Sequence, residues 1–175
     1  RNDKANGFRK NLYLKRSDTS RKDESTSRLK VNWQLADNTK IKFLISQVDL
    51  NDPADIWTID GSLNTLSDRP GMDSQKTNSY GMKVFHSFDG FELQSYTSST
   101  DTNVIFSYDA DWGNTDSHFP YVYDYFSETL RDRKSFNQEF RAVSDSADFQ
   151  KNSFFEWVIG ANYLELKESN LKKDD

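Results

Sequence analysis

The chain has 175 residues, a net charge of −5 and no cysteine; only 34% of its residues are hydrophobic, whereas 14% are aromatic. The mild negative charge argues against a nucleic-acid binder, which would show a basic patch, and the missing cysteines exclude disulfides and thiolate metal sites. No run of about 18 apolar residues is present, which excludes a transmembrane helix but not membrane strands, whose hydropathy signal is much weaker.

Alternation of apolar and polar residues predicts strands along the chain, and no stretch keeps a helical period. The clearest strand covers 28–35, where every second side chain is apolar: Leu29, Val31, Trp33 and Leu35. Because successive side chains of a strand point to opposite faces, this segment has one apolar and one polar face. A second strand follows the polar triplet 36–38, with apolar positions Ile41, Phe43 and Ile45.

A third strand is predicted over 78–88, with Met82, Val84, His86 and Phe88 on its apolar side. It ends at Asp89-Gly90, a strong two-residue hairpin signal. The partner strand begins at Phe91 and Leu93, and its alternation fades over 95–102.

The fifth and sixth strands are predicted over 130–144 and 155–164. In the fifth, Phe136, Phe140 and Ala142 alternate with polar residues, but Gln138 interrupts the apolar face. In the sixth, apolar residues recur at every second position, and Val158 and Leu164 blur the polar side. The apolar set is Phe155, Trp157, Ile159, Ala161 and Tyr163.

Short and long connections alternate between these strands. We expect short turns near 36–38, 89–90 and 145–152, and long loops near 1–23, 49–77 and 101–129. Bacterial outer-membrane barrels have short periplasmic turns and longer extracellular loops, whereas long structureless loops are uncommon in soluble domains. The sequence therefore predicts an all-β fold, about six or seven antiparallel up-and-down strands of a transmembrane β-barrel, with the long loops extracellular and the short turns periplasmic.

Several segments resemble TonB-dependent outer-membrane receptors. Residues 27–34, SRLKVNWQ, are similar to the strand that follows a polar loop in these receptors. Residues 137–144, NQEFRAVS, resemble their recurrent segment before a periplasmic turn, and 157–164, WVIGANYL, the strand after it. The loop 107–114, SYDADWGN, is also of a kind found in the family. Together the resemblance covers about 7–166.

The resemblance implies a barrel of about 22 strands, plugged by an N-terminal domain. It also implies location in the outer membrane of a Gram-negative bacterium and uptake of a scarce solute (a siderophore, vitamin or glycan) energised through TonB. The chain begins at Arg1 and ends in Lys-Lys-Asp-Asp, without the plug or the TonB-contacting segment, so we expect it to be an internal part of such a receptor. The partners expected are outer-membrane lipid, the solute and, through the absent plug, the TonB complex.

The loop 108–126 is the predicted ligand-binding region, because tyrosine and tryptophan offer much contact area at low entropic cost. Its candidate residues are Asp109, Asp111, Trp112, His118, Tyr121, Tyr123 and Tyr125. A second set is predicted to lie near strand ends, in the aromatic girdle at the membrane interface: Trp33, Trp157 and Tyr163.

No cofactor, metal site or enzymatic activity is predicted. Asp109-Ala110-Asp111 begins like a calcium loop, but position 5 is Gly113 and position 12 is Pro120, so the EF-hand pattern fails. Two other architectures stay open from the sequence. One is a soluble β-sandwich binding module, possibly for carbohydrate, with Trp112 and nearby tyrosines as a stacking platform. The other is a smaller closed barrel with a structural or adhesive role.

Overall fold

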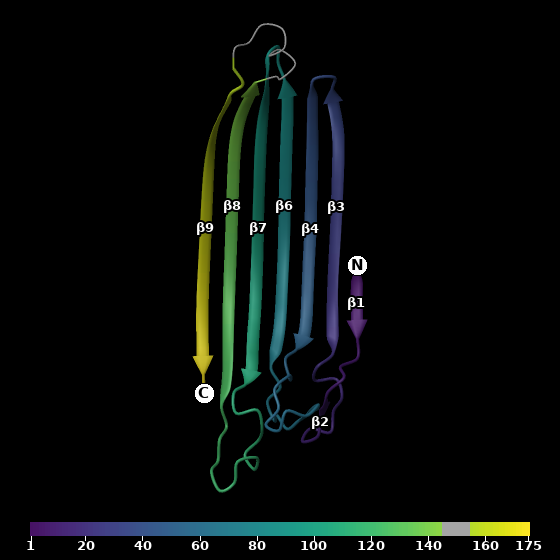
Figure 1. The fold of residues 1–175 in the computed structure, drawn as a ribbon, viewed down its shortest axis with the longest axis vertical. Helices are drawn as coiled ribbons and strands as arrows, with labels where there is room; N and C mark the ends of the chain where they lie inside the picture. Colours follow the sequence, from purple (N-terminus) through teal and green to yellow (C-terminus); the bar gives the residue numbers. More distant parts are fainter. Residues whose placement is uncertain (145–154) are drawn as a thin grey trace.

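The computed structural model describes residues 1–144 and 155–175. They form one antiparallel sheet of seven strands in the order β1-β3-β4-β6-β7-β8-β9, drawn as a single layer in Figure 1. The strands are β1 (Asn2–Ala5), β3 (Lys22–Ala36), β4 (Thr39–Pro53), β6 (Met72–Ser87), β7 (Phe91–Asp109), β8 (Phe126–Ser144) and β9 (Val158–Asp174). Two short segments, β2 (Lys10–Asn11) and β5 (Asn64–Thr65), pair in parallel beside the sheet.

The predicted all-β, antiparallel class is confirmed, and each of the six predicted strands is present. The strands run further than predicted, however, mainly toward the long connections. The loops expected at 49–77 and 101–129 are confined to 54–71 and 110–125, and the expected loop 1–23 contains β1, β2 and the first residues of β3. The sixth strand begins at Val158 rather than 155.

The extra length was missed because the added residues lack hydrophobic alternation: stretches such as 73–77 and 101–103 are polar on both faces, whereas Val104, Ile105 and Phe106 are apolar on both. Backbone pairing continues through them without interruption, for example from β6 to β7 up to Met72 and Ser107. Polar cross-strand contacts accompany this pairing: the hydroxyls of Thr77 and Thr102 lie 3.1 Å apart. Lys134 and Asp101 form an ion pair at 3.3 Å.

The connections alternate in length at the two ends of the sheet. Residues 37–38 and 88–90 link strands at one end, here called the turn end, and 54–71 and 110–125 link them at the other, the loop end (Figure 1). The predicted hairpin at Asp89-Gly90 is confirmed: Gly90 has a φ of 83°, and the Phe88 N–H donates to the Phe91 carbonyl at 2.8 Å. The third predicted turn, 145–152, lies outside the described residues.

One face of the sheet is mainly apolar in its turn half and mainly polar in its loop half, although Ile105, Leu130 and Leu171 form an apolar row of register partners there. Rows of register partners cross all the long strands, and one such row is Leu29, Ile45, Tyr80, Ser99, Phe136 and Glu165. The next row on that face toward the loop end is wholly polar: Ser27, Gln47, Asn78, Asp101 and Lys134. We call the residues of this face from the first row to the turn end the apolar band.

The opposite face is polar over much of its length.

Gln138, which interrupted the predicted apolar face, does lie within the apolar band. It accepts a hydrogen bond from Thr97 at 2.6 Å and donates to Ser95 at 3.1 Å. Its polar groups are therefore satisfied by neighbours on the adjacent strand, which is why an amide is tolerated there.

No second layer covers the apolar band among the described residues. Leu29, Val31 and Trp33 are 57%, 42% and 50% exposed. The sheet is not closed, because β1 and β9 each have one neighbour only. The buried described residues lie instead near the loop end, and nearly all are polar: Asn11, Thr19, Ala54, Asp55, Thr65, Ser67, Ser107, Asp109, Asn114 and Ser127.

Candidate functional site at the loop end

A buried polar network joins the N-terminal segment to the loop 54–71. The Asp55 carboxylate accepts hydrogen bonds from Asn11 Nδ2 at 3.0 Å and from Thr65 Oγ1 at 2.7 Å. Asn11 Nδ2 also donates to the Ser67 carbonyl at 2.7 Å. Because buried polar groups are costly without partners, this network fixes the two segments against each other. Sequence reasoning missed it, since isolated polar residues in polar loops give no sequence signal.

The loop 110–125 is built on aspartate side chains that cap backbone N–H groups. Asp109 Oδ1 accepts from the N–H groups of Asp111 and Trp112, both at 3.2 Å. Asp111 accepts from Gly113 N–H and Tyr125 N–H, both at 2.9 Å. The Asp111 carboxylate therefore stabilises the loop, since both of its oxygens accept hydrogen bonds from backbone N–H groups.

The same loop is attached to its neighbour 54–71. The Asp68 N–H donates to the Gly113 carbonyl at 2.9 Å, and Asn114 Nδ2 donates to the Leu66 carbonyl at 3.0 Å. The two long connections thus form one structured rim at the loop end. Asn114 was not among the predicted site residues, although it holds the loop in place.

Three of the predicted residues form a row of stacked rings. Tyr121, Tyr123 and Tyr125 occupy alternate positions, and successive ring centroids lie 6.4 and 5.8 Å apart at interplanar angles of 19° and 27°. The rings are 67%, 37% and 51% exposed. We call them the tyrosine row. Offset stacking stabilises such a row, and its exposure leaves its hydroxyls and outer surfaces free for contact.

His118 packs on the row, and Trp112 lies outside its ring contacts. The His118 ring meets Tyr123 edge-on, with 5.2 Å between centroids, and its Nε2 lies 3.2 Å from the Asp111 carbonyl oxygen. Trp112 has a φ of 62°, in the left-handed region, and makes no ring pair with the described aromatic residues. The structure therefore brings together Asp111, His118 and the tyrosine row, but not Trp112.

Among the predicted ligand-binding residues, Asp109 is the one whose pKa is strongly shifted. Its side chain is buried, at 5% exposure, and its Oδ2 has no hydrogen-bond partner. Burial above all, together with the charges of Asp111 and Asp68, raises the pKa of Asp109 to about 6, against the lowering effect of the nearby Ser67 hydroxyl. Ser67 does not reach hydrogen-bond geometry with that oxygen. Burial likewise raises the pKa of Asp68, with Asp124 and Asp111 as further causes.

These carboxylates do not assemble into a metal centre. Over 1–144 and 155–175, no group of three or more histidine, cysteine or acidic side chains is arranged to hold an ion. The backbone-capping bonds explain the acidic character of the loop instead.

The predicted girdle residues lie at different heights on the sheet. Trp33 and Trp157 are near the turn end. Trp157 lies 6.2 Å from Phe91, and Phe91 stacks on Phe88 at 4.9 Å. Phe88 and Phe91 were not singled out as girdle residues, although they extend this aromatic cluster. Tyr163 is not near a strand end: it lies well inside β9, beside Gln138 of β8.

Comparisons with known proteins add no family or relative. No family model, no curated protein sequence and no solved structure matches the chain. No helix among the described residues is long and apolar enough to cross a membrane. The proposal below therefore rests on the geometry of the sheet and the resemblance stated above.

Proposed function

We propose that this sheet is part of the wall of an outer-membrane β-barrel, in a TonB-dependent receptor that takes up a scarce solute such as an iron–siderophore complex. Further strands would close the barrel beyond β1 and β9. The apolar band would face lipid, the polar face would line the interior, and the loop end would project outside the cell. No covalent chemistry is assigned to the chain.

The observation that supports this most is the concentration of apolar side chains in the turn half of one exposed face. A soluble β-sandwich would pack a second sheet over these side chains, yet Leu29, Val31 and Trp33 are about half exposed. A barrel wall of which one half is embedded in lipid and the other half projects into water needs this pattern, because only the embedded half must have an apolar outer face.

The apolar band extends over much of the height of a bilayer. From Leu29 to Leu35 a strand advances about 20 Å, and from Tyr80 to Phe88 about 27 Å, at ~3.4 Å per residue. With the tilt of barrel strands, about 35–45°, these lengths correspond to roughly 15–20 Å of height, against an outward apolar band of about 25 Å in outer-membrane barrels, flanked by aromatic residues. The ring cluster of Phe88, Phe91 and Trp157 would mark its periplasmic border, and Tyr80 and Tyr163 its outer border.

In this proposal the loop end captures the solute. The tyrosine row is exposed yet held by the hydrogen bond that the Tyr125 N–H donates to the Asp111 carboxylate and by the contact with His118. A pre-ordered aromatic surface binds with little entropic cost. Transfer through the barrel would then depend on the plug and on TonB, as the family resemblance implies.

Nitroxide labelling tests the proposal directly, since the chain has no native cysteine. Labels at V31C and F43C in the complete barrel, in lipid bilayers, should be reached by lipid-soluble oxygen. Labels at K30C and K42C should be reached by a water-soluble nickel complex. Q47C, on the same face as Val31 but beyond the apolar band, is the matched control and should behave as water-exposed.

Two outcomes would contradict the proposal. One is water exposure at V31C and F43C in bilayers. The other is a 175-residue chain that stays monomeric and melts cooperatively in plain buffer, because an open sheet leaves two unpaired edges and should aggregate rather than fold alone.

A further inference from the structure

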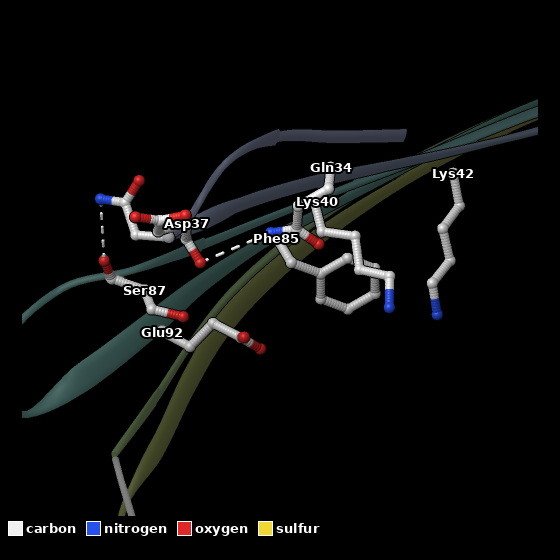
Figure 2. Close-up of a pocket in the computed structure, with 8 residues that line it drawn as sticks. Gln34, Asp37, Lys40, Lys42, Phe85, Ser87 and Glu92 are labelled. Atoms are coloured by element: carbon white, nitrogen blue, oxygen red, sulfur yellow. Dashed lines mark hydrogen bonds between the residues drawn. The ribbon is translucent and has the colours of Figure 1, made fainter. Parts of the chain in front are cut away.

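Charge is balanced in the hollow at the turn end of the polar face. This hollow has a volume of about 380 Å³, and the charged residues that line it are Asp37, Lys40, Lys42 and Glu92 (Figure 2). Two ammonium groups and two carboxylates therefore share it, and it offers no surplus charge to a ligand. An unbalanced group of carboxylates lies instead at the loop end, where the connections 54–71 and 110–125 meet.

Three contacts join these two loops. The Asp68 N–H donates to the Gly113 carbonyl at 2.9 Å, and Asn114 Nδ2 donates to the Leu66 carbonyl at 3.0 Å. Ile59 packs against the same glycine, since its Cδ1 would lie only 3.2 Å from a Cβ atom added at Gly113. We call this contact between the loops the loop junction.

Two buried oxygen atoms at the loop junction lack hydrogen-bond partners among the described residues. One is Oδ2 of Asp109, the last residue of β7, which is 5% exposed. The other is Oγ of Ser67, in the loop 54–71, which is 2% exposed. An ionised carboxylate buried in this way is costly, because it loses its water without gaining full hydrogen bonding in exchange. A proton on Oδ2 would remove the charge and would have the Ser67 hydroxyl nearby as an acceptor.

Carboxylates from both loops approach Asp109. Asp68 comes from the loop 54–71 and Asp111 from the loop 110–125, and the charge of each raises the pKa of Asp109. β8, which pairs with the end of β7, contributes the uncharged Phe126 opposite Asp109. Ionisation of Asp109 therefore places three like charges at the loop junction, two of them on one loop or its stem and one on the other.

The neighbouring cation does not offset these charges. Arg69 follows Asp68 in the chain, but its guanidinium pairs with Asp124 at 3.5 Å and with Asp175 at 2.7 Å. Both of its ion pairs are thus made with carboxylates other than Asp109. The loop junction keeps a surplus of negative charge whenever Asp109 is ionised.

We propose that the loop junction is controlled by a proton: it is closed when Asp109 is protonated and opens more often when Asp109 is ionised. Opening would hydrate the Asp109 carboxylate and separate it from Asp68. Because the pKa of Asp109 is raised from 3.8 to about 6, the closed junction binds the proton more tightly than the open one. Closure should therefore be most stable near pH 4 and weaken as pH rises toward 6.

The loop junction is continuous with the tyrosine row. Asp109 Oδ1 accepts from the N–H groups of Asp111 and Trp112, and Asp111 in turn accepts from the Tyr125 N–H. Opening at Asp109 would therefore loosen the row through Asp111, so that the capture surface is best ordered at mildly acidic pH. This effect on capture rests on the proposed function, whereas the proton-controlled junction does not.

Hydrogen exchange in the complete barrel, embedded in lipid vesicles, tests the inference. Peptides covering 64–70 and 120–126 report the two sides of the loop junction, and the rates are corrected for the intrinsic pH dependence of exchange. Both segments should open roughly fivefold more often at pH 7.5 than at pH 4.5, because the ionised carboxylate is fully hydrated only in the open junction.

Three variants assign this response. Asp109→Asn should remove it from both segments, since an amide cannot ionise but keeps an oxygen for the backbone N–H groups. Asp68→Asn should leave a smaller response, because it removes one of the two neighbouring charges. Asp116→Asn is the matched control: Asp116 is an exposed aspartate of the same loop, and this variant should respond like the unaltered protein.

Equal opening at the two pH values in the unaltered protein would overturn the inference without any variant. A response that persists in Asp109→Asn, or one that leaves 64–70 unchanged, would also overturn it. The exchange measurement reads only the loop end, and the nitroxide experiment above tests the membrane placement separately. A sheet that is embedded as proposed but shows no pH response would refute the proton-controlled junction and leave the barrel intact.

Discussion

The turn half and the loop half of this sheet share one backbone arrangement but differ in the chemistry of one face. In both halves the strands pair antiparallel in continuous register. Near the turns, that face is formed by residues such as Phe43 and Val84, whereas near the loops it is formed by residues such as Asp49 and Asn103. Regular strand pairing therefore does not depend on an apolar face, because the pattern of backbone hydrogen bonds is the same in both halves.

What replaces apolar contact in the loop half is a set of polar links between strands and loops. Thr77 pairs with Thr102, and Lys134 with Asp101. Beyond the strands, the buried network around Asp55 and the capping bonds of Asp111 hold the rim together. Each link is modest in water, so the loop half depends on many of them. The turn half, in our proposal, depends on lipid.

The largest expected effect comes from charging the apolar band. Phe43→Arg places a cation on the proposed lipid face and should destabilise the folded barrel by about 2–4 kcal/mol. Gln47 lies on the same face of β4, four residues nearer the loops, and the substitution Gln47→Arg should cost less than about 1 kcal/mol. Urea unfolding in lipid vesicles measures both. Equal losses would remove the distinction between the two halves.

A smaller effect is expected at the tyrosine row. Tyr123→Ala removes the ring that contacts both neighbours and His118, and should lower solute uptake about tenfold, as for a typical binding hot spot. Val122→Ala, at an exposed neighbouring position, is the control. Growth on a panel of single iron sources, followed by labelled-iron uptake, provides the measurement. Unchanged uptake in Tyr123→Ala would exclude the row as a capture surface.

The smallest effect is the pH response of the loop 110–125. The pKa of Asp109 is raised to about 6 from an ordinary value of 3.8, so the folded loop binds a proton more tightly than the unfolded one. The stability of the loop should therefore be highest at acid pH and decline as pH rises from about 4 to 6. Hydrogen exchange of 110–125, corrected for its intrinsic pH dependence, should report faster opening at pH 7 than at pH 4.5.

Asp109→Asn should abolish this response, because the amide keeps an oxygen for the Asp111 and Trp112 N–H groups but cannot ionise. The strand segment 28–35 serves as an internal reference. A pH response that persists in the variant would assign it to another group, such as Asp68.

Hydrophobic alternation predicted the strands only where one face is apolar. The segment 28–35 was located correctly within β3, and Asp89-Gly90 identified the hairpin between β6 and β7. The strand ends toward the loops were missed, since segments such as 101–103 are polar on both faces and resemble loop. Backbone pairing with a preformed neighbour extends such segments, and that neighbour is distant in sequence.

Only part of the candidate site could be predicted from the sequence. Tyr121, Tyr123 and Tyr125 were predicted as contact residues of one loop, and the structure stacks them on one another, which their sequence positions were not used to predict. The burial of Asp109 and the use of Asp111 as a backbone cap could not be anticipated, because they depend on the loop 54–71 packing alongside.

The sequence by itself determined the strand class, the two-faced character of the turn half and the alternation of short and long links, because these follow from the period of two and from local turn chemistry. Only the tertiary structure decided the register. Register aligned the apolar rows of separate strands into a band, and the packing of the loops 54–71 and 110–125 buried Asp109. Both depend on which residues distant in the chain become neighbours, and one chain segment does not contain that information.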